Sequence, residues 1–482
     1  LVRSRGLGDV YKRQVYNHTH RFGLNQNSVL DKIVPNYYHR LHPLTGVVEQ
    51  STCYTCGNTA TERVMMTKLM TDSLVTWARD YKIDGFRFDL MGHQPKSSML
   101  QAREVVRNVD PDTYFYGEGW NFGEVANNSQ FEQASQLMLG GTEIGTFSDR
   151  LRDAVRGGGN NTRDTQGLGN GLLFHNNEIQ SKTDYKAQYQ LRLKQLKIGL
   201  AGNLANFELI DEKGNKTLGK DVMYGDQPTG YALDPADTIN YVSKHDNQTL
   251  WDNSQYRLPF ETSTHDRVRM HIQSLSFALY AQGIPFLHMG SEFMRSKSFL
   301  RDSYDYGDWF NKVDFSMKTN NYNVGLPPAD KDKDNWPLIK KVISDHQERD
   351  KVTPKDIKVS TTAFKEMLSI RSSSPLFRLD TAEKIHQKVS FIDGNTNGNS
   401  ESGIFAMILD DTIGESVESA FSKIVVIFNL TSKTNFLPYI NASEFKLHPI
   451  QSNGSDEAIK TSKTTDKGFV IPALSSAVFV VR

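Results

Sequence analysis

The sequence predicts an α/β fold in two parts, a β/α barrel followed by an antiparallel β-sandwich. In the first part, short apolar strands alternate with amphipathic helices, which is the pattern of parallel β/α units. Near residue 380 the pattern changes to β-rich runs separated by polar turns. The length of 482 residues also exceeds the roughly 150 residues of an average domain, so we expect more than one domain.

The spacing of apolar residues predicts the elements of the first part. Residues 83–90 (IDGFRFDL) predict a strand with Phe86 and Phe88 on one face and Arg87 and Asp89 on the other. Residues 61–81 show helical spacing through Val64, Met65, Leu69, Leu74, Val75 and Ala78. Further helices are predicted at 97–108 and near 266–281, and further strands at 114–117, 239–244 and 284–289.

Residues 381–482 predict the sandwich and carry no convincing helical period. DGNTNGNSESG (393–403) is a polar turn cluster, and the apolar runs 403–409, 424–430 and 469–481 predict strands. We therefore expect the barrel over 15–380 and an all-β domain over 381–482.

Residues 1–14 (LVRSRGLGDVYKRQ) differ in character from the sequence that follows. They contain no apolar core segment of a secretory signal and run without a turn into VYNHTH (15–20). We predict a foreign junction or artefact here, and an ordinary N-terminal tail is the alternative. Because any targeting segment would lie outside this sequence, it predicts no compartment by itself.

The composition argues against several classes of protein. Lys and Arg together number 56, as do Asp and Glu, so the net charge of zero gives no overall attraction to nucleic acid or to an anionic membrane. No apolar run approaches the roughly 18 residues of a membrane span. A single CxxC pair, Cys53 and Cys56, does not predict a zinc site. It leaves open a local disulfide or two free thiols.

Polar residues gather where predicted strands end. The segments are VYNHTH (15–20), GFRFDLMGH (85–93), YFYGEGWNF (114–122) and YVSKHDNQTLWD (241–252). In a β/α barrel these ends form the active-site face, so Asp89, Glu118 and Asp246 are expected to converge there. Glycoside hydrolysis needs one protonated and one ionised carboxyl group. Arg87 can keep Asp89 ionised, whereas an apolar wall including Trp120 could raise the pKa of Glu118 toward an acid role.

These segments resemble the conserved regions of the α-amylase clan of glycoside hydrolases. Their details are similar to the pullulanase and limit-dextrinase group, which cleaves α-1,6 branches. FSDRLRDAVRGG (147–158), RSKSFLRDSYDYGDWFN (295–311) and HPIQSNGSD (448–456) are similar to that group as well. The resemblance covers about 15–482. It implies an N-terminally truncated (β/α)8 TIM barrel, because the first two barrel strands have no counterpart here.

The resemblance also implies roles for individual residues. Asp89 falls at the nucleophile, Glu118 at the general acid/base, and Asp246 at the carboxylate that stabilises the transition state. A retaining double displacement follows, with nucleophile and acid/base roughly 5 Å apart. Other positions are expected to bind the α-glucan, by charge, hydrogen bonds or stacking of rings on flat sugar faces: His18, Arg87, Trp120, Phe122, His245, Arg301 and Asp302.

Other interpretations remain open for the residues and for the whole chain. Arg301 and Asp302 could form a loop-stabilising ion pair, and Trp120 could be core filler. An α-1,4-acting amylase, a branching transferase or an inactive glucan-binding fragment would share the same barrel. The resemblance requires no cofactor; related enzymes often bind structural calcium, but no segment fits a twelve-residue calcium loop and no site can be placed. It also weakly favours an extracellular or cell-surface location. The sequence does not predict the oligomeric state.

Overall fold

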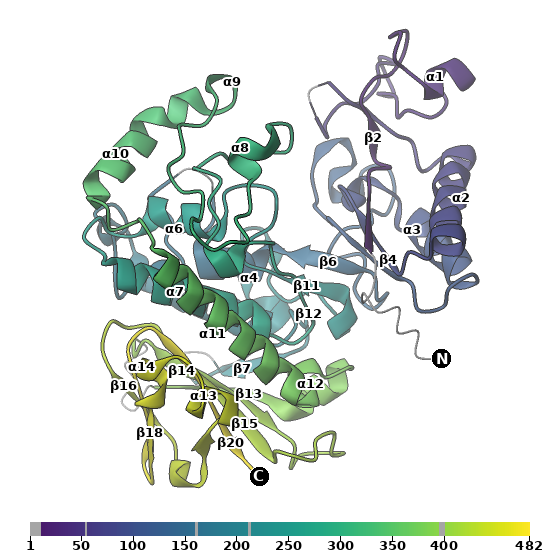
Figure 1. Cartoon of the computed structure of the whole chain (residues 1–482). Coiled ribbons are helices and arrows are strands. Elements are labelled where there is room, and N and C mark those ends of the chain that lie inside the picture. Colours follow the sequence, from purple (N-terminus) through teal and green to yellow (C-terminus); the bar gives the residue numbers. More distant parts are fainter. Residues whose placement is uncertain (1–10, 54, 160–161, 211–213, 395–400) are drawn as a thin grey trace. The chain divides into compact units, whose positions relative to one another are not determined.

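A computed structural model describes residues 11–53, 55–159, 162–210, 214–394 and 401–482 (Figure 1). The chain forms two compact units. The first comprises Leu1–Phe147 and Tyr231–Ile239, and the second comprises Ser148–Gly230 and Asn240–Arg482.

The first unit is built on a parallel sheet. Neighbouring strands follow the order β1-β4-β5-β6-β11. These strands are β1 (Tyr11–Gln14), β4 (Gly85–Phe88), β5 (Tyr114–Gly117), β6 (Gly145–Ser148) and β11 (Thr238–Asn240). A short antiparallel ribbon joins β2 (His18–Thr19) to β3 (Gly57–Asn58), and the helices are α1 (Leu30–Ile33), α2 (Val64–Tyr81) and α3 (Lys96–Arg107).

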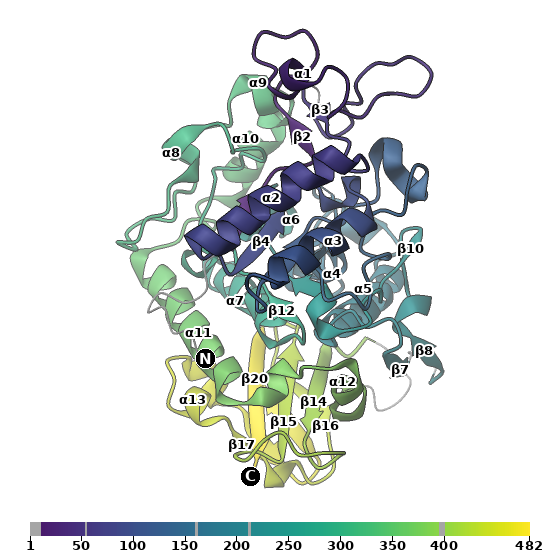
Figure 2. The same cartoon turned by 90° about the vertical axis from the view of Figure 1, so that its right-hand side faces the viewer.

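Two helices cover one face of this sheet. Figure 2 shows α2 and α3 side by side, and their buried residues share one core cluster with the strands. β4 contributes Phe86 and Phe88 to that cluster and β5 contributes Phe115, whereas Arg87 between the two phenylalanines makes polar contacts instead. The alternation of side chains along a strand therefore separates the apolar core from the polar face, as the sequence predicts.

The predicted helix over 61–81 is present as α2, but its buried face differs from the prediction. Val64 is 77% exposed, and Met65 and Leu69 are also exposed. Its buried residues are Met66, Thr67, Met70, Thr71, Leu74 and Ala78. The Thr67 hydroxyl forms hydrogen bonds with Thr61 O and with the Ser98 hydroxyl, which satisfy this polar side chain in its buried position.

A distant segment completes the first unit. Residues 231–239 carry Asp237, whose carboxylate accepts hydrogen bonds from Gly141 N at 2.7 Å and Glu143 N at 2.8 Å. The Tyr114 hydroxyl at the start of β5 donates to Ala236 O at 2.7 Å. A segment that follows much later in the sequence thus holds both the loop before β6 and the first residue of β5.

The second unit contains the remaining elements. Its helices are α4 (Asp149–Arg156), α5 (Tyr185–Leu200), α6 (Leu250–Arg257), α7 (Thr264–Tyr280), α8 (Gly307–Asn311), α9 (Ala329–Asp332), α10 (Trp336–His346), α11 (Pro354–Ser373), α12 (Ala382–Lys388), α13 (Pro449–Ser452) and α14 (Glu457–Lys460). Its strands before residue 380 are β7 (Glu208–Ile210), β8 (Lys216–Leu218), β9 (Met223–Tyr224), β10 (Gln227–Pro228) and β12 (Ile284–Pro285).

The end of the chain forms two antiparallel sheets. One has the order β13-β14-β15-β20-β17, and the other β16-β19-β18. The strands are β13 (Val389–Asp393), β14 (Ile404–Asp410), β15 (Lys423–Asn429), β16 (Asn435–Pro438), β17 (Lys446–Leu447), β18 (Lys463–Thr465), β19 (Gly468–Ile471) and β20 (Ser475–Val481).

The core of this region lies between the two sheets. β14 and β15 are buried along nearly their whole length, which explains why they appear in the sequence as continuous apolar runs. Side chains of both sheets share one core cluster, among them Ala406, Val425, Leu437, Phe469 and Phe479. The short helices α12, α13 and α14 were not predicted from the sequence.

The parallel sheet and the antiparallel sheets agree with the predicted fold class. The strands that the structure describes form an open row, however, and no closed barrel is present among them. β1 lies inside the segment 1–14, where the sequence predicts a junction; residues 1–10 of that segment lie outside the described residues. Within the described ranges, no helix is long and apolar enough to cross a membrane.

Candidate active site

Asp89 follows β4 directly and lies beside Arg87 of that strand. Arg87 Nη1 is 2.6 Å from Asp89 Oδ1, and the side chains are 5% and 14% exposed. Asp89 N donates to Gln14 O at 2.8 Å, which holds the backbone at this strand end. The predicted partnership of the arginine with the aspartate is therefore present.

Glu118 follows β5, the neighbour of β4 in the sheet. Its Oε1 is 2.7 Å from Arg87 Nη2, and its side chain is 5% exposed. Its Oε2 accepts a hydrogen bond from Leu90 N at 3.0 Å. One guanidinium thus contacts both predicted carboxylates, because parallel neighbouring strands end at the same edge of the sheet.

Charge around Asp89 favours its ionised form. Burial alone would raise the pKa of Asp89, but the guanidinium groups of Arg87 and Arg13 outweigh burial and hold that pKa below its ordinary value of 3.8. Arg13 Nη2 lies 3.0 Å from Asp89 Oδ1. Burial lowers the pKa of His18, and the charge of Asp89 partly offsets this effect. An anionic aspartate therefore faces a neutral imidazole near neutral pH.

The predicted aromatic platform follows Glu118. Trp120 and Phe122 are both half-buried. A Cβ on Gly92 would come within 2.2 Å of Trp120 O, so the turn after β4 packs closely on the turn after β5. The ring of Phe122 meets the edge of His93, with ring centroids 4.5 Å apart.

Asp246 lies in the second unit, within its own charged cluster. Its Oδ2 is 2.8 Å from Lys244 Nζ and its Oδ1 is 3.3 Å from His245 Nε2. Its side chain is 44% exposed. The structure therefore brings together Asp89, Glu118, Arg87 and His18 in the first unit, and Asp246 with His245 in the second.

Arg301 lies near the same cluster of the second unit. Its Nε donates to Asn247 Oδ1 at 3.2 Å, and Lys297 Nζ donates to both His245 O and Arg301 O at 3.0 Å. Asp302 is exposed. Among the described residues, Arg301 forms no ion pair with Asp302, so the alternative of a local ion pair is not supported.

Sequence reasoning missed two polar residues near Asp246, the buried Lys297 and the partly buried His288. Burial lowers the pKa of Lys297 to about 8 and that of His288 to about 3. The charge of Asp246 acts on both groups. Lys297 belongs to the segment 295–311 already singled out, so its place in that motif was an available signal. His288 lies inside the predicted strand 284–289, where nothing in the pattern marks it as a site residue.

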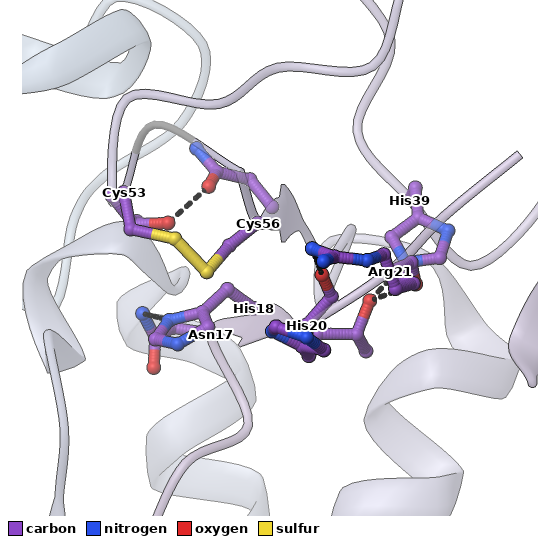
Figure 3. Close-up of a disulfide and its surroundings, with 10 residues drawn as sticks. Asn17, His18, His20, Arg21, His39, Cys53 and Cys56 are labelled. Carbon is purple, nitrogen blue, oxygen red and sulfur yellow. Dashed lines mark hydrogen bonds between the residues drawn. A yellow bond between two sulfur atoms is a disulfide. The ribbon is translucent and has the colours of Figure 1, made fainter. Parts of the chain in front are cut away.

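The two cysteines form a disulfide. Cys53 and Cys56 are joined with their Cα atoms 5.3 Å apart, next to β3 (Figure 3). The first of the two alternatives left by the sequence is thus the one observed. No group of three or more His, Cys, Asp or Glu side chains in the described part of the chain could hold a metal ion.

Comparison with known proteins places these residues in a family. Residues 317–482 match the family model described as "Alpha-1,6-glucosidases, pullulanase-type, C-terminal". The chain is 43% identical to a pullulanase of Klebsiella pneumoniae over 476 residues, which is 96% of this chain and 42% of that protein. The chain belongs to the pullulanase group of the α-amylase family.

Other pullulanases agree with this placement. Pullulanase 1, chloroplastic, of Arabidopsis thaliana is 41% identical over 97% of this chain and 50% of its own. The crystal structure of a maltotriose complex of PulA from Klebsiella pneumoniae matches with a TM-score of 0.91 at 42% identity, covering 98% of this chain and 51% of that one. The chain thus spans about half the length of the pullulanases that it matches.

Proposed function

We propose that this chain carries the catalytic residues of a retaining glycoside hydrolase that cleaves α-1,6 linkages in pullulan, branched starch fragments and limit dextrins. The observation that supports the proposal most directly is the single guanidinium of Arg87, held between Asp89 at 2.6 Å and Glu118 at 2.7 Å. Two carboxylates at neighbouring strand ends are the groups that double displacement at a sugar carbon requires.

In the first step, Asp89 acts as the nucleophile. An Asp89 carboxylate oxygen attacks the anomeric carbon, and the bond from that carbon to the α-1,6 oxygen breaks. Glu118 donates its proton to the departing oxygen, so the leaving sugar departs with a neutral hydroxyl. The depressed pKa of Asp89 keeps the nucleophile ionised for this attack.

In the second step, water replaces the enzyme at the anomeric carbon. Glu118, now ionised, takes a proton from the water as its oxygen attacks, and the bond to Asp89 breaks. Both groups return to their starting forms and the configuration is retained. We assign to Asp246 the stabilisation of positive charge on the sugar ring. His18, His245, Arg87, Arg301 and Asp302 would bind hydroxyls, and Trp120 and Phe122 would stack on sugar faces.

The same reasoning extends to the fold and to the compartment. We propose that the parallel sheet is part of a (β/α)8 barrel, which the alternation of β4, α3 and β5 supports. The Cys53–Cys56 disulfide supports an oxidising, extracellular or cell-surface location. Neither step needs a cofactor, and a structural calcium ion would show as a loss of thermal stability on addition of a chelator.

Chromatography of the products from pullulan tests the activity. Wild-type protein is compared with Asp89→Asn, which keeps the shape of the side chain, and with Asp80→Asn, which changes an exposed aspartate of α2. We expect maltotriose from wild type and Asp80→Asn. For Asp89→Asn we expect the rate to fall by roughly a thousandfold or more, because the nucleophile is removed.

Other products would support other functions. Panose-type products would indicate cleavage of α-1,4 linkages, and new branches in amylose would indicate a transferase. Binding of maltotriose without any turnover, unchanged by Asp89→Asn, would indicate a glucan-binding protein.

A further inference from the structure

A buried acidic residue in the first unit has no part in the steps above. The Glu124 side chain is 8% exposed and follows the platform residue Phe122 by two positions. It accepts hydrogen bonds from Arg40 Nη1 at 2.7 Å, from Asn58 Nδ2 at 2.9 Å and from the Ser51 hydroxyl. Burial alone would raise the pKa of Glu124, but these donors outweigh it and lower the pKa to about 2. Glu124 is therefore ionised at neutral pH and joins the loop after β5 to the stretch 40–58.

Arg40 extends this network, and its backbone N–H donates to Asn58 O at 2.8 Å. It is almost fully buried and also contacts the Glu62 carboxylate at 2.8 Å. Its Nη2 donates to His93 O at 3.0 Å, at the end of the turn that follows Asp89. The planar fork of Arg40 donates to both oxygens of Glu62 while it also holds Glu124 and the His93 carbonyl, a geometry that the single ammonium of a lysine does not provide. Arg40 thus holds the turn that follows the proposed nucleophile Asp89.

One connection leads from Glu124 to Phe122 through His93. His93 Nε2 is 3.1 Å from Ser51 Oγ and 3.9 Å from Glu124 Oε2, and the same imidazole packs against the Phe122 ring. Gly123, between Phe122 and Glu124, has a positive φ of 75°, and a Cβ there would lie 2.6 Å from Ser51 Oγ and 2.7 Å from His93 Nε2. The close contact leaves Phe122 little freedom to turn.

A second connection leads from Glu124 to His18 through Asn58. Asn58 lies in β3 and pairs with His18 in β2, and Thr59 N donates to Asn17 O at 3.0 Å. The Cys53–Cys56 disulfide (Figure 3) closes a short loop between Ser51 and Asn58, the two neutral donors to Glu124. A displacement of the loop would therefore move the strand that pairs with His18.

We propose that Glu124 is a positioning residue for α-glucan binding, which orients Phe122 and His18 toward the sugar that lies next to the scissile bond. The inference rests on the proposed function, since both residues act there on a sugar. Glu124 acts through Ser51, Asn58, Arg40 and His93. Loss of its charge should weaken binding of the sugar more than it slows the chemical step.

The test compares Glu124→Gln with wild type by steady-state hydrolysis of pullulan and by calorimetric binding of maltotriose. The variant keeps the shape, but its amide group would turn a donor toward Asn58, Arg40 or Ser51. We expect KM and the Kd for maltotriose to rise about tenfold, with kcat changed less than about threefold. Glu132→Gln is the matched control, because Glu132 is 56% exposed and pairs with Lys96 at the surface.

A merely structural role would give a different result. It would lower the melting temperature and the active fraction, so kcat would fall while KM and Kd stay unchanged, and that outcome would overturn the proposal. Ser51→Ala removes one donor to Glu124 and serves if Glu124→Gln fails to fold; it should raise KM and Kd in the same direction.

The binding measurement separates this proposal from the proposed activity. Wild-type protein that binds maltotriose without hydrolysing pullulan would overturn the activity, and the Kd of Glu124→Gln would still decide the positioning role. Wild-type protein that neither binds nor hydrolyses would overturn both.

Discussion

Removal of the guanidinium that bridges the two carboxylates should change the pH dependence of hydrolysis in a defined direction. Arg87→Met keeps most of the length of the stem and removes both contacts, to Asp89 at 2.6 Å and to Glu118 at 2.7 Å. At an effective dielectric constant of about 20, one such contact is worth about 6 kcal/mol of Coulomb energy. The cost of removing the two ions from water offsets much of this Coulomb energy, so the net effect on the pKa of Asp89 is smaller.

The size of the change follows from the effect of a neighbouring arginine. Such an arginine lowers the pKa of an aspartate by about 1 to 3 pH units, or about 1.4 to 4 kcal/mol. Arg13, which remains 3.0 Å from Asp89, is half-exposed and retains only a small part of this effect. We therefore expect the pKa of Asp89 to rise by about 1 to 3 pH units in Arg87→Met.

The acid limb of kcat/KM measures this change. In wild type, the folded-state pKa of Asp89 lies below 3.8, so the nucleophile and the stability of its ion pair are lost only as the pH falls through that lower value. In Arg87→Met the limb should move to higher pH by about 1 to 3 units. Hydrolysis of pullulan is measured by reducing-end release from about pH 3 to about pH 7, on protein shown by its melt to be folded.

Two variants serve as controls. Arg79→Met removes an exposed ion pair to Asp80 on α2 and should leave the acid limb in place. Arg87→Lys keeps the positive charge but loses the planar pair of guanidinium donors. It should therefore shift the acid limb of kcat/KM less than Arg87→Met does. A folded Arg87→Met whose acid limb coincides with that of wild type would refute the account of Asp89 given above.

Three further predictions concern other parts of the chain. Gly92→Ala places a Cβ within 2.2 Å of Trp120 O, so the turn must move, and KM for pullulan should rise severalfold at near-constant kcat in steady-state kinetics; an unchanged KM would contradict the close packing. Replacement of both Cys53 and Cys56 by serine should lower the free energy of unfolding in urea by about 2 kcal/mol, which is the closure entropy of so short a loop. A reductant should cause the same loss of stability in wild type and no further loss in the variant. Asp411→Asn should cost about 2 kcal/mol in urea unfolding near neutral pH. Burial alone would raise the pKa of Asp411, but hydrogen bonds from Ser416, backbone amides and Lys388 outweigh it and lower the pKa to about 2. The stability that the Asp411 carboxylate contributes is fully present above pH 3.8, the ordinary pKa, and is lost as the pH falls toward about 2. A difference in unfolding free energy between wild type and variant that stays constant with pH would argue against this account.

Local patterns in the sequence were enough to predict β4 and β5. Phe86 and Phe88 alternate with Arg87 and Asp89, and this period of two is a property of the strand alone. The face of α2 was predicted less well, because Thr67 and Thr71 are buried where a hydropathy pattern expects apolar residues. The buried Thr67 hydroxyl is satisfied by Thr61 and Ser98, which lie outside α2, and such partners are set by the fold.

The candidate site shows the same division. Asp89 and Glu118 follow predicted strands within motifs, and their shared contact with Arg87 follows from the parallel pairing of those strands. Glu124 could not be found in this way, because its donors Arg40, Ser51 and Asn58 lie in the stretch 40–58, which has no periodic spacing. A buried anion of this kind can be identified only from the three-dimensional structure, which shows the residues that neutralise its charge.

The return of residues 231–239 to the first unit has a consequence for the synthesis of the protein. When residue 147 has left the ribosome, Gly141 and Glu143 still lack the Asp237 carboxylate that receives their amide hydrogens, and the Tyr114 hydroxyl lacks Ala236 O. About 90 more residues must be translated first, which takes roughly 5 to 20 s at typical rates. During that interval the edge of β6 that later pairs with β11 stays open, and an unpaired strand edge is prone to aggregation.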